Sequence, residues 1–172
     1  MIRILLHIVF LLLLFTIQVS FIHALPYPFD RIPFVLVVTI YLYQYQNQTS
    51  SWWWLVCYGI VLDVLSISHA PLEVFSYTLL TGTMMLLVAH VFTNRSFYGM
   101  AATSILCLTV LTVSEVSIRA LSHVFTSAPF LWRSVLTVNL WAVFFACLLL
   151  LFVFPPLRRI QVWVKQLFLD RI

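Results

Sequence analysis

The sequence predicts an all-α protein of the polytopic integral membrane class, a bundle of five to six transmembrane helices. Apolar residues make up 63% of its 172 positions and charged residues only 8%, and the mean hydropathy is +1.09. A soluble domain devotes about a quarter of its residues to charged side chains, which hydrate its surface. With so few charges, lipid must cover the outside of this protein instead of water.

The first expected span runs from residue 4 to about residue 24. Arg3 and the apolar run after it resemble a signal peptide, but the run continues to about Ala24 without a small-x-small cleavage site. We therefore expect a first helix that is retained. Three prolines between residues 26 and 33 follow, and they indicate a loop because proline breaks helices.

The second expected span, residues 33–45, is short. At about 1.5 Å per residue it covers only about 20 Å, less than a hydrocarbon core of about 30 Å. We expect a short, tilted or re-entrant element, and its nature decides between five and six crossings. A polar stretch within residues 44–51 ends it, and three tryptophans at residues 52–54 follow as an interfacial anchor.

Four further spans are separated by short polar or proline-containing stretches, and they are expected at residues 52–67, 72–93, 97–124 and 131–154. In the last segment, residues 157–172, apolar side chains gather on one helical face and basic ones lie largely elsewhere. This pattern is typical of a helix that lies in the membrane interface. We therefore expect a transmembrane bundle over residues 1–156 and an amphipathic C-terminal tail over residues 157–172.

Six crossings place both termini on the same side of the membrane. Six basic residues would then lie with the termini and three on the opposite side: Arg3, Arg95, Arg158, Arg159, Lys165 and Arg171 against Arg31, Arg119 and Arg133. This excess predicts that both termini are cytoplasmic. The formal net charge of +4 suits contact with membrane lipids, and the sequence offers no basic groove for nucleic acid.

Asp63 is the first candidate functional residue. It lies eleven residues after Trp52, so it sits about 16 Å below the interface that the tryptophans mark. A carboxylate at such a depth is expected to face the bundle interior and to be protonated or paired. Two interpretations stay open: a functional intramembrane site, or a link between two helices through hydrogen bonds to neighbouring Ser, Thr or Tyr side chains.

The fifth expected span carries Glu115 and Arg119 four residues apart, on one helical face that His123 extends by a turn. Glu115 and His123 suit a proton or ion path, whereas a Glu115–Arg119 pair that neutralises itself near the outer interface is the interpretation we favour. Glu73 opens the fourth span, where the helix dipole alone explains a negative charge.

Motifs that carry catalysis or bind cofactors are missing from the sequence. The five histidines are scattered without HExxH spacing, the three cysteines stand far apart without a CxxC pair, and the three glycines form no phosphate-binding loop. No GxSxG motif is present either. We therefore expect no catalytic residue, no metal site and no cofactor, and a protein that is not an enzyme.

Two segments of the chain resemble a known family. They read GIVLDVL at residues 59–65 and PLEVFSYTL at residues 71–79, and LPYPFDRIPFVLVVTIYLY precedes them at residues 25–43. Together they resemble the bacterial rod shape-determining protein MreD family, whose third span carries a G-x-x-x-D pattern. Gly59 and Asp63 match that pattern, and the layout is similar over residues 1–93.

The resemblance implies a non-enzymatic scaffold subunit of the cell-wall elongation machinery in the bacterial inner membrane. Its implied partners are an MreC-type scaffold, a RodA-type glycosyltransferase and a class B penicillin-binding transpeptidase. It also implies a fold similar to the substrate-binding subunits of energy-coupling-factor vitamin transporters. The intramembrane polar or partner-contact candidates are Gly59, Asp63, Glu73, Glu115 and Arg119.

Two other functions are weighed against the scaffold. A small-molecule or vitamin transport subunit would line its cavity with Asp63, Glu115 and Arg119. An intramembrane enzyme acting on lipid would need a nucleophile or a metal cluster, which the sequence does not provide. Neighbouring genes would discriminate between the scaffold and the transporter. Genes for MreC and the elongation synthase would indicate the scaffold, and an adjacent pair of ATPase genes would indicate transport.

Overall fold

The computed structural model describes residues 2–66, 72–92, 96–126 and 136–152, and all regular structure in them is helical. The elements in chain order are α1 (Ile2–Thr16), η1 (Ile17–Ile22), η2 (Phe29–Arg31), α2 (Phe34–Ile40), η3 (Tyr41–Tyr45), η4 (Thr49–Ser51), α3 (Trp52–Ser66), α4 (Leu72–Leu86), η5 (Leu87–Val91) and α5 (Phe97–Thr126). A further helix is Leu136–Phe152. The all-α prediction is therefore confirmed for the described residues.

Two helices in the described part of the chain are long and apolar enough to cross a membrane, Leu72–Val91 and Phe97–Ile118. Three other apolar helices are shorter: Ile8–Ile22, Trp52–Ser66 and Leu136–Phe152. Each of the six expected spans has a helical counterpart, but the number of crossings, five to six, stays a prediction. The expected amphipathic tail, residues 157–172, lies outside the described residues.

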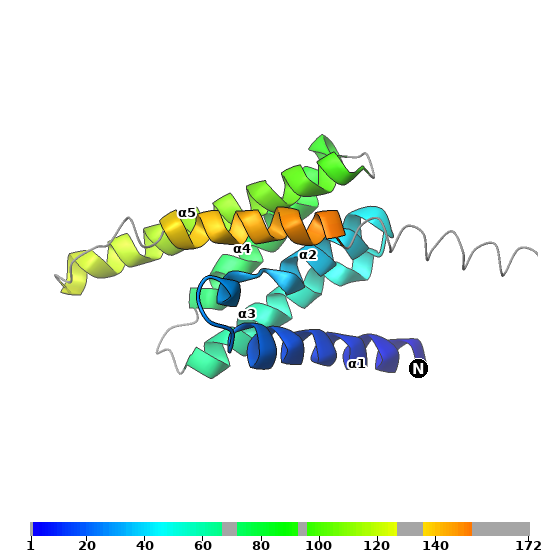
Figure 1. The fold of residues 1–172 in the computed structure, drawn as a ribbon, viewed down its shortest axis with the longest axis horizontal. Helices are drawn as coiled ribbons and strands as arrows, with labels where there is room; N and C mark the ends of the chain where they lie inside the picture. The colour runs from blue at the N-terminus through cyan, green and yellow to red at the C-terminus, as the bar shows by residue number, and fades with distance from the viewer. Residues whose placement is uncertain (1, 67–71, 93–95, 127–135, 153–172) are drawn as a thin grey trace, which may run out of the picture.

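The second helix, α2 with η3, is a central element of the bundle. Five of the seven residues of α2 are buried: Val35, Leu36, Val37, Thr39 and Ile40. It packs against α3 and α5, and Figure 1 shows it enclosed between the longer helices. The short apolar run thus forms a helix that its neighbours surround, which explains why apolar residues occupy its whole circumference.

Three helices end in a π-helical turn, in which each main-chain N–H bonds five residues back. These turns are η1, η3 and η5, which follow α1, α2 and α4. Two of them hold a buried glutamine, Gln18 in η1 and Gln44 in η3. Gln44 donates from Nε2 to the Phe92 carbonyl at 3.0 Å and accepts from the Thr103 hydroxyl at 3.2 Å. It thereby joins the end of the second helix to the fourth and fifth helices.

The outer faces of the helices are apolar. Large hydrophobic side chains are exposed on several of them, including Val64 at 72%, Phe75 at 63%, Leu86 at 63% and Leu140 at 68%. Apolar surface of this extent marks contact with another apolar phase or partner rather than with water.

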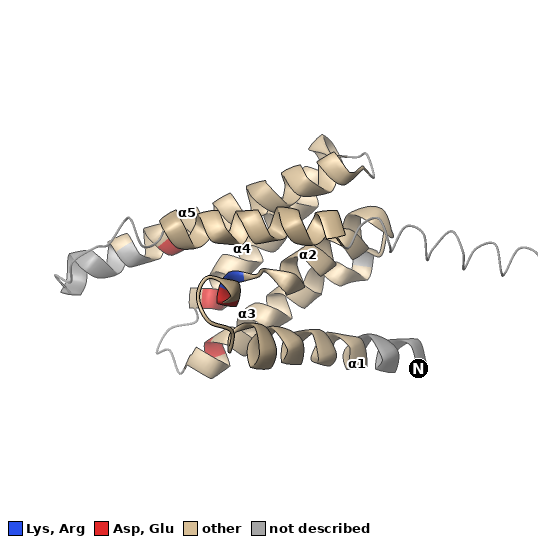
Figure 2. Ribbon diagram, viewed as in Figure 1, with Lys and Arg blue, Asp and Glu red and all other residues tan. Residues whose placement is uncertain are grey.

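The charged side chains that the structure describes gather at one end of the bundle (Figure 2). They are Asp30, Arg31, Asp63, Glu73 and Glu115. We call this the polar end. It holds residues 23–33 and the first turns of α2 and α4, and it lies away from the N-terminus (Figure 1).

Gly59 sits where α3 and α4 pack closely against each other. A Cβ atom at this position would lie 3.0 Å from Tyr77 Cβ, 3.1 Å from the Glu73 carbonyl oxygen and 3.1 Å from Val74 Cα. Two of these atoms belong to the main chain, which cannot move without shifting α4. Gly82, on the exposed side of α4, has no atom within 4 Å of the corresponding position.

We expect Gly59→Val to lower the free energy of unfolding by about 1–3 kcal/mol, because the added methyl groups force α3 and α4 apart. Gly82→Val is the matched control and should have a much smaller effect. Thermal unfolding of the two purified variants in detergent measures the difference. Equal effects of the two substitutions would contradict the close packing at Gly59.

Candidate functional site

The polar end is organised by two side chains that cap the starts of helices. The first main-chain N–H groups of a helix have no partner within that helix, so they must be satisfied from elsewhere. Gln18, which is only 3% exposed, supplies the partner for these N–H groups of α2. Its Oε1 accepts from the N–H groups of Phe34 at 3.0 Å and Val35 at 3.3 Å, and its Nε2 donates to the Ile32 carbonyl at 2.9 Å.

Asp63 does the same for α4. Its two carboxylate oxygens accept from the main-chain N–H groups of Glu73 at 3.0 Å and Val74 at 2.8 Å. The sequence pointed to hydroxyl partners for a link between helices, but the partners are these N–H groups of the first turn. Asp63 lies three residues before the end of α3, on the same face as Gly59, so both residues of the G-x-x-x-D pattern face the start of α4.

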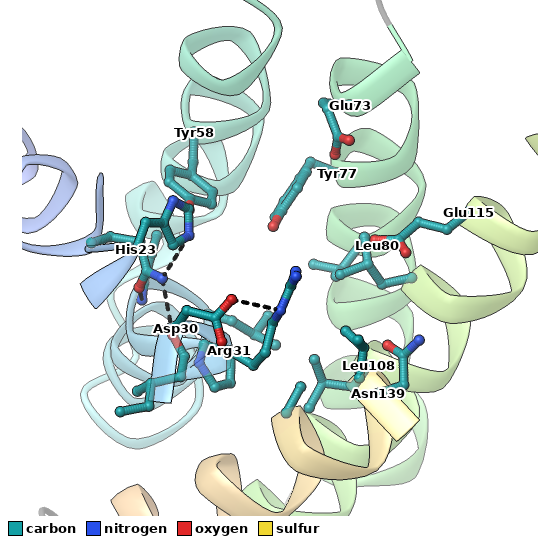
Figure 3. A pocket seen from close by; sticks show the side chains of 18 residues that line it. His23, Asp30, Arg31, Tyr58, Glu73, Tyr77, Leu80, Leu108, Glu115 and Asn139 are labelled. Carbon is teal, nitrogen blue, oxygen red and sulfur yellow. Dashed lines mark hydrogen bonds and ion pairs between the residues drawn. The ribbon is translucent and has the colours of Figure 1, made fainter. Parts of the chain in front are cut away.

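A cavity of about 320 Å³ opens between the helices at the polar end (Figure 3). Its polar lining comes from several elements that are distant in the sequence: Gln18, His23, Asp30, Arg31, Tyr58, Glu73, Tyr77, Glu115 and Asn139. Leu80, Leu108 and Leu111 contribute part of its apolar wall. Its volume lies at the lower end of the range for small-molecule sites, about 300–1,000 Å³.

Asp30 and Arg31, in the short helix η2, bring an ion pair to this cavity. Arg31 Nε lies 3.0 Å from Asp30 Oδ2, and Figure 3 shows the guanidinium extending into the space between Asp30 and Tyr77. The second carboxylate oxygen of Asp30, Oδ1, is buried and has no hydrogen-bond partner among the described residues.

Tyr58 from α3 and Tyr77 from α4 form the aromatic part of the lining. Their rings meet edge to face with centroids 5.2 Å apart. Glu73 and Glu115 line the same cavity as Tyr77, and Figure 3 shows the Tyr77 hydroxyl pointing into it.

The structure brings together two of the five residues predicted from the sequence, Glu73 and Glu115, which line the same cavity. Gly59 and Asp63 instead fix the packing of α3 on α4. Arg119 falls within α5, but its side chain lies outside the described residues, as does that of His123. The Glu115–Arg119 pair and the proton path through His123 therefore stay predictions.

Sequence reasoning missed most of the cavity. The residues it did not single out are Gln18, His23, Asp30, Arg31, Tyr58, Tyr77 and Asn139. One local signal was available, because Tyr77 follows Glu73 by four residues and so shares its helical face. Asp30 and Arg31 carry no such signal, since they stand in a loop that could equally have been exposed.

The lining contains groups that can bind a ligand. No group of three or more His, Cys, Asp or Glu side chains within the described residues is placed to hold a metal ion. The cavity offers carboxylates, phenol groups and an already paired guanidinium, which recognise a ligand through hydrogen bonds and charge.

Comparisons with known proteins give no match. No family model matches the chain, and no curated protein or solved structure matches it.

Asp63→Leu should remove both hydrogen bonds to the start of α4 and lower the free energy of unfolding by about 2 kcal/mol. Asp63→Asn keeps one oxygen acceptor and should cost about half as much. Ser66→Ala, which changes an exposed hydroxyl that donates to the Asp63 carbonyl, is a control from the same turn. Denaturant unfolding followed by circular dichroism measures all three variants, and equal losses for Leu and Asn would contradict the capping role.

Partial burial of the imidazole and the positive charge of Arg31 lower the pKa of His23 below its ordinary value of 6.5, while Asp30 opposes this shift. The folded protein thus disfavours the protonated ring, so stability is lost as the pH falls from 6.5 through the lowered pKa. Arg31→Gln should raise the pKa of His23. An NMR titration of the ring protons measures it, with His23→Gln used for assignment, and a pKa of 6.5 or above in the unmodified protein would contradict the prediction.

Proposed function

We propose that this chain is a multi-span protein of the bacterial inner membrane with five to six crossings and both termini in the cytoplasm. Two observations support this proposal. The helices Leu72–Val91 and Phe97–Ile118 have the length and apolar composition for crossing, and large apolar side chains cover the outer faces of the helices. Lipid contact accounts for such an exterior.

Within this class, we propose a non-enzymatic scaffold subunit of the cell-wall elongation machinery. The observation that carries the proposal is the Gly59–Asp63 pair, which matches the G-x-x-x-D pattern of the MreD family and joins α3 to the first turn of α4. A helix pair fixed in this way is suited to present a constant surface to other membrane proteins. The proposed partners are the MreC-type scaffold, the RodA-type glycosyltransferase and the class B penicillin-binding transpeptidase.

The polar cavity favours a second candidate, a membrane subunit that transports a small molecule or vitamin. Binding sites of transport proteins are lined by polar and ionisable groups within a helical bundle. The cavity fits this description through Glu73 and Glu115. Asp63, expected in such a cavity, is instead engaged with the start of α4.

Depletion of the protein in its native host should turn rod-shaped cells into round ones, because a scaffold that is lost can no longer hold the elongation enzymes together. Microscopy of cells after depletion measures the change in shape. A plasmid copy of the unmodified gene should restore rods, and so should a Gly82→Val copy, because a Cβ atom at this position has no atom within 4 Å. Rods that persist after depletion would overturn the scaffold proposal.

A further inference from the structure

We propose that the cavity at the polar end binds a small organic cation that carries amino groups. The proposal concerns a ligand of the chain itself, and it depends on neither the scaffold role nor the transport role. It rests on three properties of the described lining: an excess of negative charge, a buried carboxylate oxygen without a partner, and a spacing that does not suit a metal ion.

The charge of the lining is the first argument. Three of the five acidic residues in the whole sequence line this one cavity, Asp30, Glu73 and Glu115. Among the described lining residues, the basic side chains are Arg31 and His23, and Arg31 Nε is paired with Asp30 at 3.0 Å. A cavity in which charges of one sign predominate concentrates their field and attracts an ion of the opposite sign.

An acceptor atom without a partner is the second argument. Asp30 Oδ1 is buried and has no hydrogen-bond partner among the described residues. A buried polar atom without a hydrogen bond costs about 1–3 kcal/mol. Figure 3 shows the Tyr77 hydroxyl pointing into the same cavity. A ligand that donates N–H groups would satisfy Asp30 Oδ1 and offer a donor to this hydroxyl.

The kind of cation follows from size and spacing. The acidic residues that line the cavity do not converge into a group that could hold a metal ion. The cavity of about 320 Å³ has room for about ten water molecules at about 30 Å³ each, far more than one ion fills. An ammonium group has three N–H donors for spaced acceptors, and the rings of Tyr58 and Tyr77 add a surface that attracts cations.

The amine could be a free molecule or the headgroup of phosphatidylethanolamine, since the two share the same chemistry. Arg31 is 46% exposed, so the polar end admits a ligand from outside the bundle. The experiment must therefore separate the two sources.

The test uses the full chain in nanodiscs of phosphatidylcholine and three probes of the same carbon length. Putrescine carries two ammonium groups, 1,4-butanediol is uncharged and succinate carries two carboxylates. We expect calorimetric binding of putrescine alone. In nanodiscs that contain phosphatidylethanolamine, weaker apparent binding of putrescine shows that the headgroup competes for the cavity, and unchanged binding shows that a free amine is the ligand.

Matched variants locate the binding. The double substitution Glu73→Gln and Glu115→Gln keeps the shape of both side chains. It should weaken the binding of putrescine at least about tenfold, because hydrogen bonds to charged groups are lost. Tyr58→Phe should weaken this binding severalfold, and Asp170→Asn, which changes an acidic residue of the C-terminal tail, should leave it unchanged. Thermal unfolding without ligand checks that each variant is folded.

Three results would overturn the proposal. The first is no binding of putrescine to the unmodified protein. The second is a preference for succinate, which would assign the cavity to an anion held by Arg31. The third is putrescine binding that the Glu73 and Glu115 substitutions leave unchanged, which would place the amine elsewhere. None of these results bears on the shape of depleted cells, so the scaffold proposal is tested separately.

Discussion

The structure depends on how the main-chain N–H groups at the starts of α2 and α4 are satisfied. Away from water, each such group without a partner costs several kcal/mol. Gln18 and Asp63 solve the problem in the same way, because each side chain reaches from a helix to the start of the next one along the chain. Two consecutive helix pairs are thereby fixed at the same end of the bundle.

The cavity follows from these two caps. Asp63 holds the first turn of α4 against α3, and Gly59 permits the close approach. As a result Glu73 enters the lining from this turn, and Tyr77, one turn later, meets Tyr58. Gln18 fixes the start of α2 to the end of α1, and the loop between them brings Asp30 and Arg31 to the opposite side of the same space.

Sequence reasoning predicted the helices well because apolar runs and their polar or proline-containing breaks are local signals. It located the short second helix, and it placed Glu73 at the start of the fourth. It could not find the partner of Asp63, since a side chain that caps a different helix leaves no periodic pattern in its own. Gln18 was missed for a related reason: a single glutamine in an apolar run does not reveal whether it faces lipid, a neighbouring helix or a helix start.

The polar groups at the two ends of the bundle differ in charge, and this difference bears on the orientation of the chain in a membrane. At the end near the N-terminus, the neutral Gln44 joins three helices through hydrogen bonds to Phe92 and Thr103. At the polar end, the described charged side chains are four carboxylates and the guanidinium of Arg31. Basic residues favour the cytoplasmic side of a membrane protein, and most of those in the sequence are expected with the termini. In the proposed orientation, with both termini in the cytoplasm, a cavity at the opposite end would open away from the cytoplasm, toward an amine outside the cell or in the outer leaflet.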